Sequence, residues 1–258
     1  NHTTNQRLAV LDENFELVKQ RDDLFLRYIT LLNCKGEYQK ALEGIQSRRF
    51  HPWEGGEGTV STQYRFALTQ LAVAKIAAGE SVDAIELLEQ AIEYPENLGE
   101  GKLPNVPDNS LHYLMGIAYL KAGQKQKADE MCNLATAGDQ TPQPVRYYND
   151  QPSDFIYYQG MAYRMLGNEA AAKKSFHQLI SYGEKHLFDQ IGYDFFAVSL
   201  PEIEVCQENT ALRHTQYCNY LRALGHLGLG EKEKANTLLK EILQKDHQHQ
   251  GALVMAVL

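Results

Sequence analysis

Acidic and aromatic residues gather in Gly- and Pro-rich segments of this sequence, and these residue types are the ones that carbohydrate chemistry uses. Glu54, Glu57, Glu100 and Asp150 all lie in such segments, and the only tryptophan, Trp53, lies beside the first of them. Two carboxyl groups held at a suitable separation can hydrolyse a glycosidic bond. The sequence alone does not place these segments relative to one another, so the pairing of these carboxylates stays open.

Other signatures of catalysis or cofactor binding do not occur in the chain. The glycines between 55 and 58 lack the following Lys-Ser or Lys-Thr, and the strand-to-helix context, of a phosphate-binding loop. The nearest approach to a histidine cluster is 246–249, whose alternate histidines at a helix boundary are a weak metal signal. We therefore expect a protein that is not an enzyme by itself and needs no cofactor or metal.

The cysteines are scattered and form no close CxxC pair, which argues against a disulfide scaffold or a zinc knuckle. They are Cys34, Cys132, Cys206 and Cys218. We expect Cys132 and Cys218 to be buried small apolar side chains in helices. A reducing compartment follows as the expected setting, and we predict a cytoplasmic location.

Charge and composition argue against a nucleic-acid partner and against a membrane-spanning segment. The chain has 258 residues, with 33 acidic against 25 basic side chains and a net charge of −8, and it contains no long basic tract. Nucleic-acid affinity needs clustered Lys and Arg, so a nucleic-acid partner is not expected. Hydrophobic residues make up 43% of the chain, which suffices for a core, but no apolar run reaches the roughly 20 residues that span a bilayer.

An internal repeat organises the chain. A glycine followed five residues later by alanine recurs at Gly36–Ala41, Gly79–Ala84, Gly123–Ala128, Gly167–Ala172 and Gly230–Ala235, at intervals of 43, 44, 44 and 63 residues. Apolar residues at helical spacing lie before and after each glycine, which predicts a series of helical hairpins. Glycine suits the turn because it accepts left-handed backbone angles, and alanine lets two helices approach closely.

Gly116 and Gly160 lie seven residues before their turn glycines, and Tyr119 and Tyr163 lie four before them. With these offsets the chain resembles the tetratricopeptide repeat family, over units near 22–48, 65–94, 109–137, 153–180 and 214–246. The resemblance implies an all-α, superhelical solenoid of about five helical hairpins. Residues 22–258 would form this repeat domain, ending in a capping helix near 250–258, after an irregular lead or linker over 1–21.

Each repeat exceeds the family's period of about 34 residues, because a segment is inserted after its second helix. The insertions lie near 50–58, 94–102, 138–152 and 181–211, and they are expected to emerge along one edge. The first two share a Gly-Glu-Gly sequence, centred on Glu57 and Glu100. Each glutamate either lies in a turn, where its carboxylate caps the next helix or bonds neighbouring amides, or it contacts a ligand. Trp53 either packs its loop onto the solenoid or is offered to a sugar or peptide.

The segments His51–Gly58, Asn97–Gly101 and Ser199–Pro201 also resemble the carboxy-terminal repeat region of large bacterial proteins. Those proteins begin with a β-sandwich domain of unknown function that is similar to galactose mutarotases. The resemblance implies that this chain is a fragment whose amino-terminal domain is missing, in a carbohydrate-related setting. It transfers no catalytic residue.

In this fold the first helix of each pair lines the concave face, which here would be apolar and rich in tyrosine, with Tyr113, Tyr157 and Tyr220 on it. Tyrosine suits a partly wet contact surface. Asn33 and Arg164 are the polar exceptions. Asn33 is expected to bond the backbone of its own turn, and Arg164 to take an anionic partner or an ordinary acid, Asp154 or Glu202.

These observations lead to two functional hypotheses. The first is a non-enzymatic scaffold that binds a protein or peptide partner, or its own amino-terminal domain, through the concave groove and the loop edge. The alternative is a carbohydrate-binding module, or an accessory part of a carbohydrate-active enzyme, with its site on the inserted loops; the repeats could also mediate only self-association. The predicted binding residues are Trp53, Glu57, Glu100, Tyr113, Tyr147, Tyr157, Arg164 and Tyr220, and no membrane partner is expected.

Overall fold

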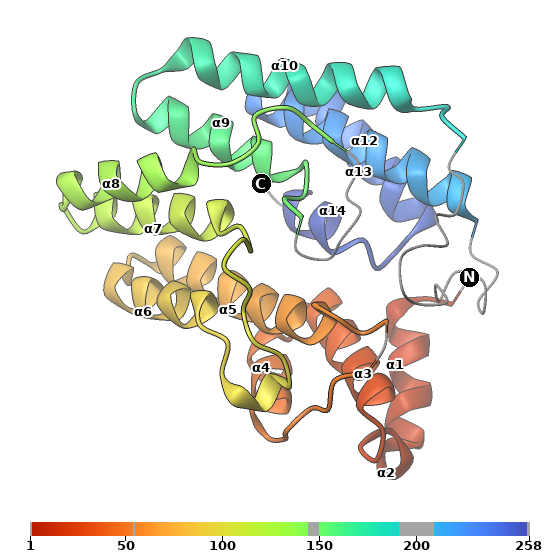
Figure 1. Ribbon diagram of the computed structural model, residues 1–258. Helices are drawn as coiled ribbons and strands as arrows, with labels where there is room; N and C mark the ends of the chain where they lie inside the picture. The colour runs from red at the N-terminus through yellow and green to blue at the C-terminus, as the bar shows by residue number, and fades with distance from the viewer. Residues whose placement is uncertain (1, 54, 144–149, 191–208, 257–258) are drawn as a thin grey trace.

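A computed structural model describes residues 2–53, 55–143, 150–190 and 209–256, and these ranges form helices and connecting loops without a strand (Figure 1). The prediction of an all-α solenoid of five hairpins is confirmed. The hairpins pair α3 (Asp22–Cys34) with α4 (Tyr38–Gln46), α5 (Thr59–Ala78) with α6 (Ser81–Ile92), α7 (Asn109–Lys121) with α8 (Lys125–Ala135), α9 (Phe155–Met165) with α10 (Glu169–His186), and α12 (Thr210–Gly228) with α13 (Lys232–Lys245).

The repeated glycine and alanine have the roles that their spacing predicts. The five turn glycines have φ between 75° and 83°, and each alanine five residues later is at most 1% exposed. Gly160 lies directly against the partner helix, where an added Cβ would fall 2.5 Å from the ring of Phe176. The hairpins therefore close because small residues stand where two helix backbones meet.

The amino-terminal lead is helical, which corrects the expectation of an irregular segment. It forms α1 (Thr4–Glu13) and α2 (Phe15–Val18). A capping box starts α1, because the Gln6 N–H donates to Thr3 Oγ1 at 3.3 Å and the Thr3 N–H donates to Gln6 Oε1 at 2.8 Å. Leu8 and Val18 are buried in the same core as α3, so apolar packing stabilises these two helices in addition to the capping box.

The hairpins follow a curved path, and the last helix, α14 (Gln250–Met255), lies on the inner side of the curve (Figure 1). It contacts α3 of the first hairpin as well as α13. Gln63 Nε2 donates to Gln250 Oε1 at 3.1 Å, and Gln250 Nε2 donates to Gln63 Oε1 at 2.8 Å. The predicted final helix thus joins the last repeat to the first, instead of covering only the last hairpin.

Asn33 belongs to the same junction and not to its own turn, which corrects that prediction. Its Nδ2 donates to the backbone O of Gln63 at 3.1 Å and to Gln63 Oε1 at 3.0 Å. The Nδ2 group of this buried amide thus finds both of its acceptors, one backbone and one side-chain oxygen, on Gln63 of the next repeat.

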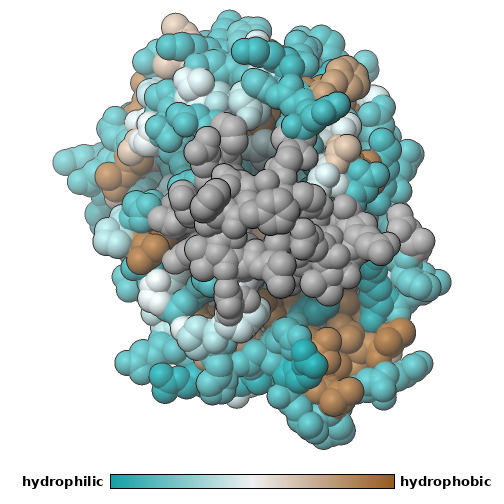
Figure 2. Space-filling view, turned by 45° about the vertical axis from the view of Figure 1, so that its right-hand side comes forward, coloured by the Kyte–Doolittle hydropathy of each residue, from teal (hydrophilic) through white to brown (hydrophobic). Residues whose placement is uncertain are grey.

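Two apolar cores support the curve, one spanning α1 to α7 and the other α9 to α14. A small cluster with Tyr113 and Cys132 joins them, and Cys132 and Cys218 are fully buried as predicted. Most of the residues coloured in Figure 2 are hydrophilic, and the largest group of apolar side chains lies at the lower right. In the part of the chain that the structure describes, no helix is both long enough and apolar enough to cross a bilayer.

Candidate functional site

Residues 50–58 and 94–103, here called the loop edge, are joined by the two Gly-Glu-Gly segments. The Glu100 carboxylate accepts the N–H of Gly58 at 2.8 Å and the N–H of Ser61 at 3.0 Å. Gly58 is the N-cap of α5, where unpaired N–H groups and the helix dipole favour an anion. The predicted capping role of this glutamate is correct in kind, but Glu100 caps α5, the first helix of the hairpin before it, and not the next helix, α7.

Backbone contacts hold the two segments together. Asn97 Nδ2 donates to the carbonyl oxygens of Ile45 at 2.9 Å and Arg48 at 3.1 Å, and the Phe50 N–H donates to Asn97 O at 2.8 Å. Gly99 has φ 77° and lies so close that an added Cβ would fall 2.5 Å from Phe50 O. The first two insertions thus form one continuous structure.

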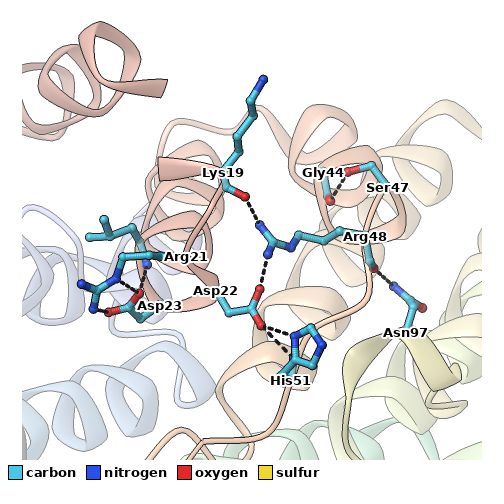
Figure 3. A network of polar contacts seen from close by, with 10 residues as sticks. Lys19, Arg21, Asp22, Asp23, Gly44, Ser47, Arg48, His51 and Asn97 are labelled. Carbon is cyan, nitrogen blue, oxygen red and sulfur yellow. Dashed lines mark hydrogen bonds and ion pairs between the residues drawn. The ribbon is translucent and has the colours of Figure 1, made fainter. Parts of the chain in front are cut away.

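Asp22, the first residue of α3, anchors the beginning of this edge (Figure 3). Its carboxylate pairs with the guanidinium of Arg48, accepts the N–H of His51 at 2.8 Å, and lies 3.0 Å from His51 Nδ1. The guanidinium of Arg48 also lies over the ring of Phe50, 5.3 Å from its centre. These contacts involve side chains that bear charge, but they serve to fix the loop.

Trp53, Glu57 and Glu100 line one depression on the loop edge, with a volume of about 630 Å³. The Trp53 ring is half-buried and lies on Gly56, where an added Cβ would fall 2.1 Å from Trp53 Cε2. Glu57 is exposed. The structure therefore brings together three of the predicted residues, and the role of Trp53 in packing its loop does not remove it from this surface. Glu54 lies outside the described residues.

Arg164 lies away from the loop edge and is engaged within its own hairpin. Its Nε and Nη2 donate to the two carboxylate oxygens of Glu169, each at 3.0 Å, and the guanidinium lies 5.1 Å from the centre of the Phe176 ring. The expectation that Asp154 or Glu202 is its ordinary partner was wrong about Asp154, because Glu169 opens the next helix within reach. Glu202 lies outside the described residues.

The predicted tyrosines have different surroundings. Tyr113 and Tyr157 are buried at the junction of the third and fourth repeats, where both rings contact Tyr158, with ring centres 6.0 and 5.4 Å away. Tyr220 is 7% exposed, and its ring lines a cavity on the concave side. Tyr147 lies outside the described residues.

This central cavity has a volume of about 350 Å³ and lies between α5, the loop edge, the first turns of α7 and α9, and α14. Its walls include Thr62, Arg65, Phe66, Tyr94, Glu100, Leu103, Pro107, Asp154, Phe155, Tyr158, Tyr220, Gln250 and Val254. Aromatic rings and polar groups thus converge there from segments nearly 200 residues apart in sequence.

The basic side chains near this cavity are already paired. Arg65 donates to Asp108 at 2.5 Å, to the carbonyl oxygen of Pro107 at 3.2 Å and to the hydroxyl of Tyr94 at 3.4 Å. Lys102 donates to the other oxygen of Asp108 at 2.6 Å. Asp108 therefore holds both cations at the wall, where charged partners make strong hydrogen bonds.

Asp154 differs from these groups because, among the described residues, its carboxylate meets only its own backbone N–H and no hydrogen bond or ion pair from another residue. It is the N-cap residue of α9, but its side chain does not cap the helix. Burial raises its pKa to about 6, and its charge is felt by Tyr158, Tyr217 and Tyr220, whose pKa values are raised chiefly by their own burial. The sequence suggested Asp154 only as a possible partner of Arg164.

The weak metal signal at 246–249 has another explanation in part. The His249 ring accepts the N–H of Ala252 at its Nδ1, 3.1 Å away, and so caps α14. Burial lowers the pKa of His249, which keeps the ring neutral and able to accept. Within the described ranges, no three His, Cys, Asp or Glu side chains are grouped so as to hold a metal ion.

Comparison with known proteins agrees with this fold. Residues 154–182, which contain the α9–α10 hairpin except its last turn, match the tetratricopeptide repeat family. No solved structure matches the chain.

Proposed function

We propose that this chain, of which residues 154–182 match the tetratricopeptide repeat family, is a non-catalytic scaffold that holds a segment of a partner protein. Solenoids of such repeats expose extended concave surfaces, and binding along them is the common use of the architecture. In this chain the partner segment would bind to the concave side and the adjoining loop edge.

The central cavity is the observation that carries this proposal. At about 350 Å³ it falls in the range of ligand sites, and it could accept one or two side chains of a bound segment. Thr62, an exposed residue of α5, lies at its wall. Aromatic rings with a few placed polar groups, such as Tyr158 beside Asp154, are the usual lining of a recognition pocket.

A peptide selection with two matched variants tests the proposal. Random twelve-residue peptides would be selected on the immobilised chain, and the enriched ones titrated calorimetrically. Thr62→Trp places a large ring at the cavity wall, whereas Ala74→Trp places the same ring on the same helix at an exposed position away from it. We expect Thr62→Trp to weaken binding at least tenfold and Ala74→Trp to leave it unchanged.

Two results would count against the scaffold proposal in this form. Failure to enrich any peptide would remove its support. Peptides that bind both variants as well as the unmodified chain would show that binding lies away from the cavity.

A second candidate function is carbohydrate binding at the loop edge, favoured by the depression that Trp53, Glu57 and Glu100 share. An indole ring offers apolar area, and carboxylate oxygens accept hydrogen bonds from sugar hydroxyls. Because Trp53 is the only tryptophan, its fluorescence reports directly on this surface. Titration with gluco-, manno- and galacto-oligosaccharides should shift the emission, and a flat response at millimolar sugar would argue against this candidate.

A further inference from the structure

The central cavity carries an excess of negative charge. Arg65 and Lys102 are both held by Asp108, and the charge of Glu100 faces the N-terminus of α5. Among the described residues, the Asp154 carboxylate then has no hydrogen bond or ion pair from any residue but itself. Asp154 is half-buried, and a charge that is partly removed from water gains from a partner, because its desolvation otherwise costs free energy.

Aromatic rings line the same cavity as this carboxylate. Phe155 and Tyr158 follow it on α9, with ring centres 6.2 Å apart, and Tyr220 faces the cavity from α12. Ring faces attract cations, most strongly where water is excluded. A carboxylate next to such rings favours a positive group with an apolar stem.

From this arrangement we infer that the cavity receives a cationic group, an ammonium or a guanidinium, which pairs with Asp154 and lies against Tyr158 and Tyr220. The inference rests on the proposed function and adds the chemistry of the segment that binds: a lysine or arginine side chain at its centre. The stem of such a side chain covers apolar surface while its end carries the charge. A free polyamine would present the same chemistry.

The test compares peptides that differ in one position. Arrayed nine-residue peptides with Lys, Arg, Gln or Glu at a fixed centre, and spermidine as the small amine, would be titrated into the full chain. Asp154→Asn keeps the shape of the side chain and removes its charge. Asp129→Asn is the matched control, because Asp129 pairs with Lys125 on the exposed side of α8 and does not line the cavity.

We expect peptides with central Lys or Arg to bind at least tenfold more tightly than those with Gln or Glu. Asp154→Asn should abolish this preference, and Asp129→Asn should preserve it. Far-UV circular dichroism of both variants would show that a loss of binding is not a loss of fold.

The remaining outcomes separate the inference from the proposed function. Peptide binding that ignores the central charge, with Asp154→Asn unchanged, would overturn the cationic site but keep the scaffold. Spermidine binding that depends on Asp154, without peptide binding, would support the cationic site and overturn the scaffold. Absence of both would overturn both.

Discussion

Asp154→Asn is expected to make the folded protein more stable at neutral pH. A pKa of about 6 in place of the ordinary 3.8 corresponds to about 3 kcal/mol of differential free energy between the two protonation states. The side chain keeps partial exposure to the cavity, so we expect about 1 to 2 kcal/mol in practice. Asparagine is as good an N-cap residue as aspartate, so the start of α9 should not suffer.

The direction in which stability changes with pH follows from the raised pKa of Asp154. Folding raises the pKa of Asp154, so between about pH 4 and 6 the folded state binds more protons than the unfolded state, and stability falls as pH rises through this window. Below it the carboxyl is neutral in both states. Asp154→Asn should therefore be more stable than the unmodified chain at pH 7.5 and nearly equal to it at pH 4.

Urea unfolding of both proteins, followed by far-UV circular dichroism at pH 7.5, 6 and 4, measures the difference. Asp129→Asn at an exposed ion pair should change stability by less than about 0.5 kcal/mol at pH 7.5. If Asp154→Asn proved less stable at pH 7.5, the carboxylate would have a stabilising partner. If the difference did not vary with pH, folding would leave its pKa unshifted. Either result would remove the basis of the reasoning for a cationic ligand.

Substitutions at a helix cap, at a close helix contact and at a pair of hydrogen-bonded amides give further expected outcomes. Glu100→Ala removes the hydrogen-bond acceptor at the start of α5 and should lower stability by about 1 to 2 kcal/mol, whereas Glu57→Ala should change stability by less than about 0.5 kcal/mol. Thermal melts would compare the two variants, and equal effects would refute the capping role of Glu100. Gly160→Ala should cost about 1 to 3 kcal/mol by overpacking, measured by urea unfolding, and a neutral result would mean that the hairpin can open without penalty. A double-mutant cycle with Gln63→Ala and Gln250→Ala should give a coupling of about 0.5 to 1.5 kcal/mol, and additive effects would show that this amide pair does not help to hold α14 against α5.

The predicted site and the observed one overlap only in part, because the tertiary fold decides which residues reach the central cavity. Glu100 and Tyr220 of the predicted set line the central cavity, whereas Arg164 pairs with Glu169 and does not line it. Arg65 and Asp154 were not predicted as site residues. A weak signal existed for Asp154, since a polar residue between an insertion and the first helix of a repeat stands where loops and groove meet.

Local sequence determined the hairpins of this protein. Glycine at each turn and alanine five residues later act through backbone angle and close approach, which depend on a few neighbouring residues, so the repeats could be recognised without coordinates. The start of α1 was equally local, since its capping box lies within Thr3–Gln6.

Tertiary structure decided which insertions meet and where the curve closes. Glu100 reaches the amides of α5 from 42 residues away, and Gln250 pairs with Gln63 across 187 residues. Such contacts depend on the sum of many small rotations between repeats, which no local pattern encodes. For the same reason the charge state of the cavity, with Asp108 holding two cations and Asp154 holding none among the described residues, exists only in the folded chain.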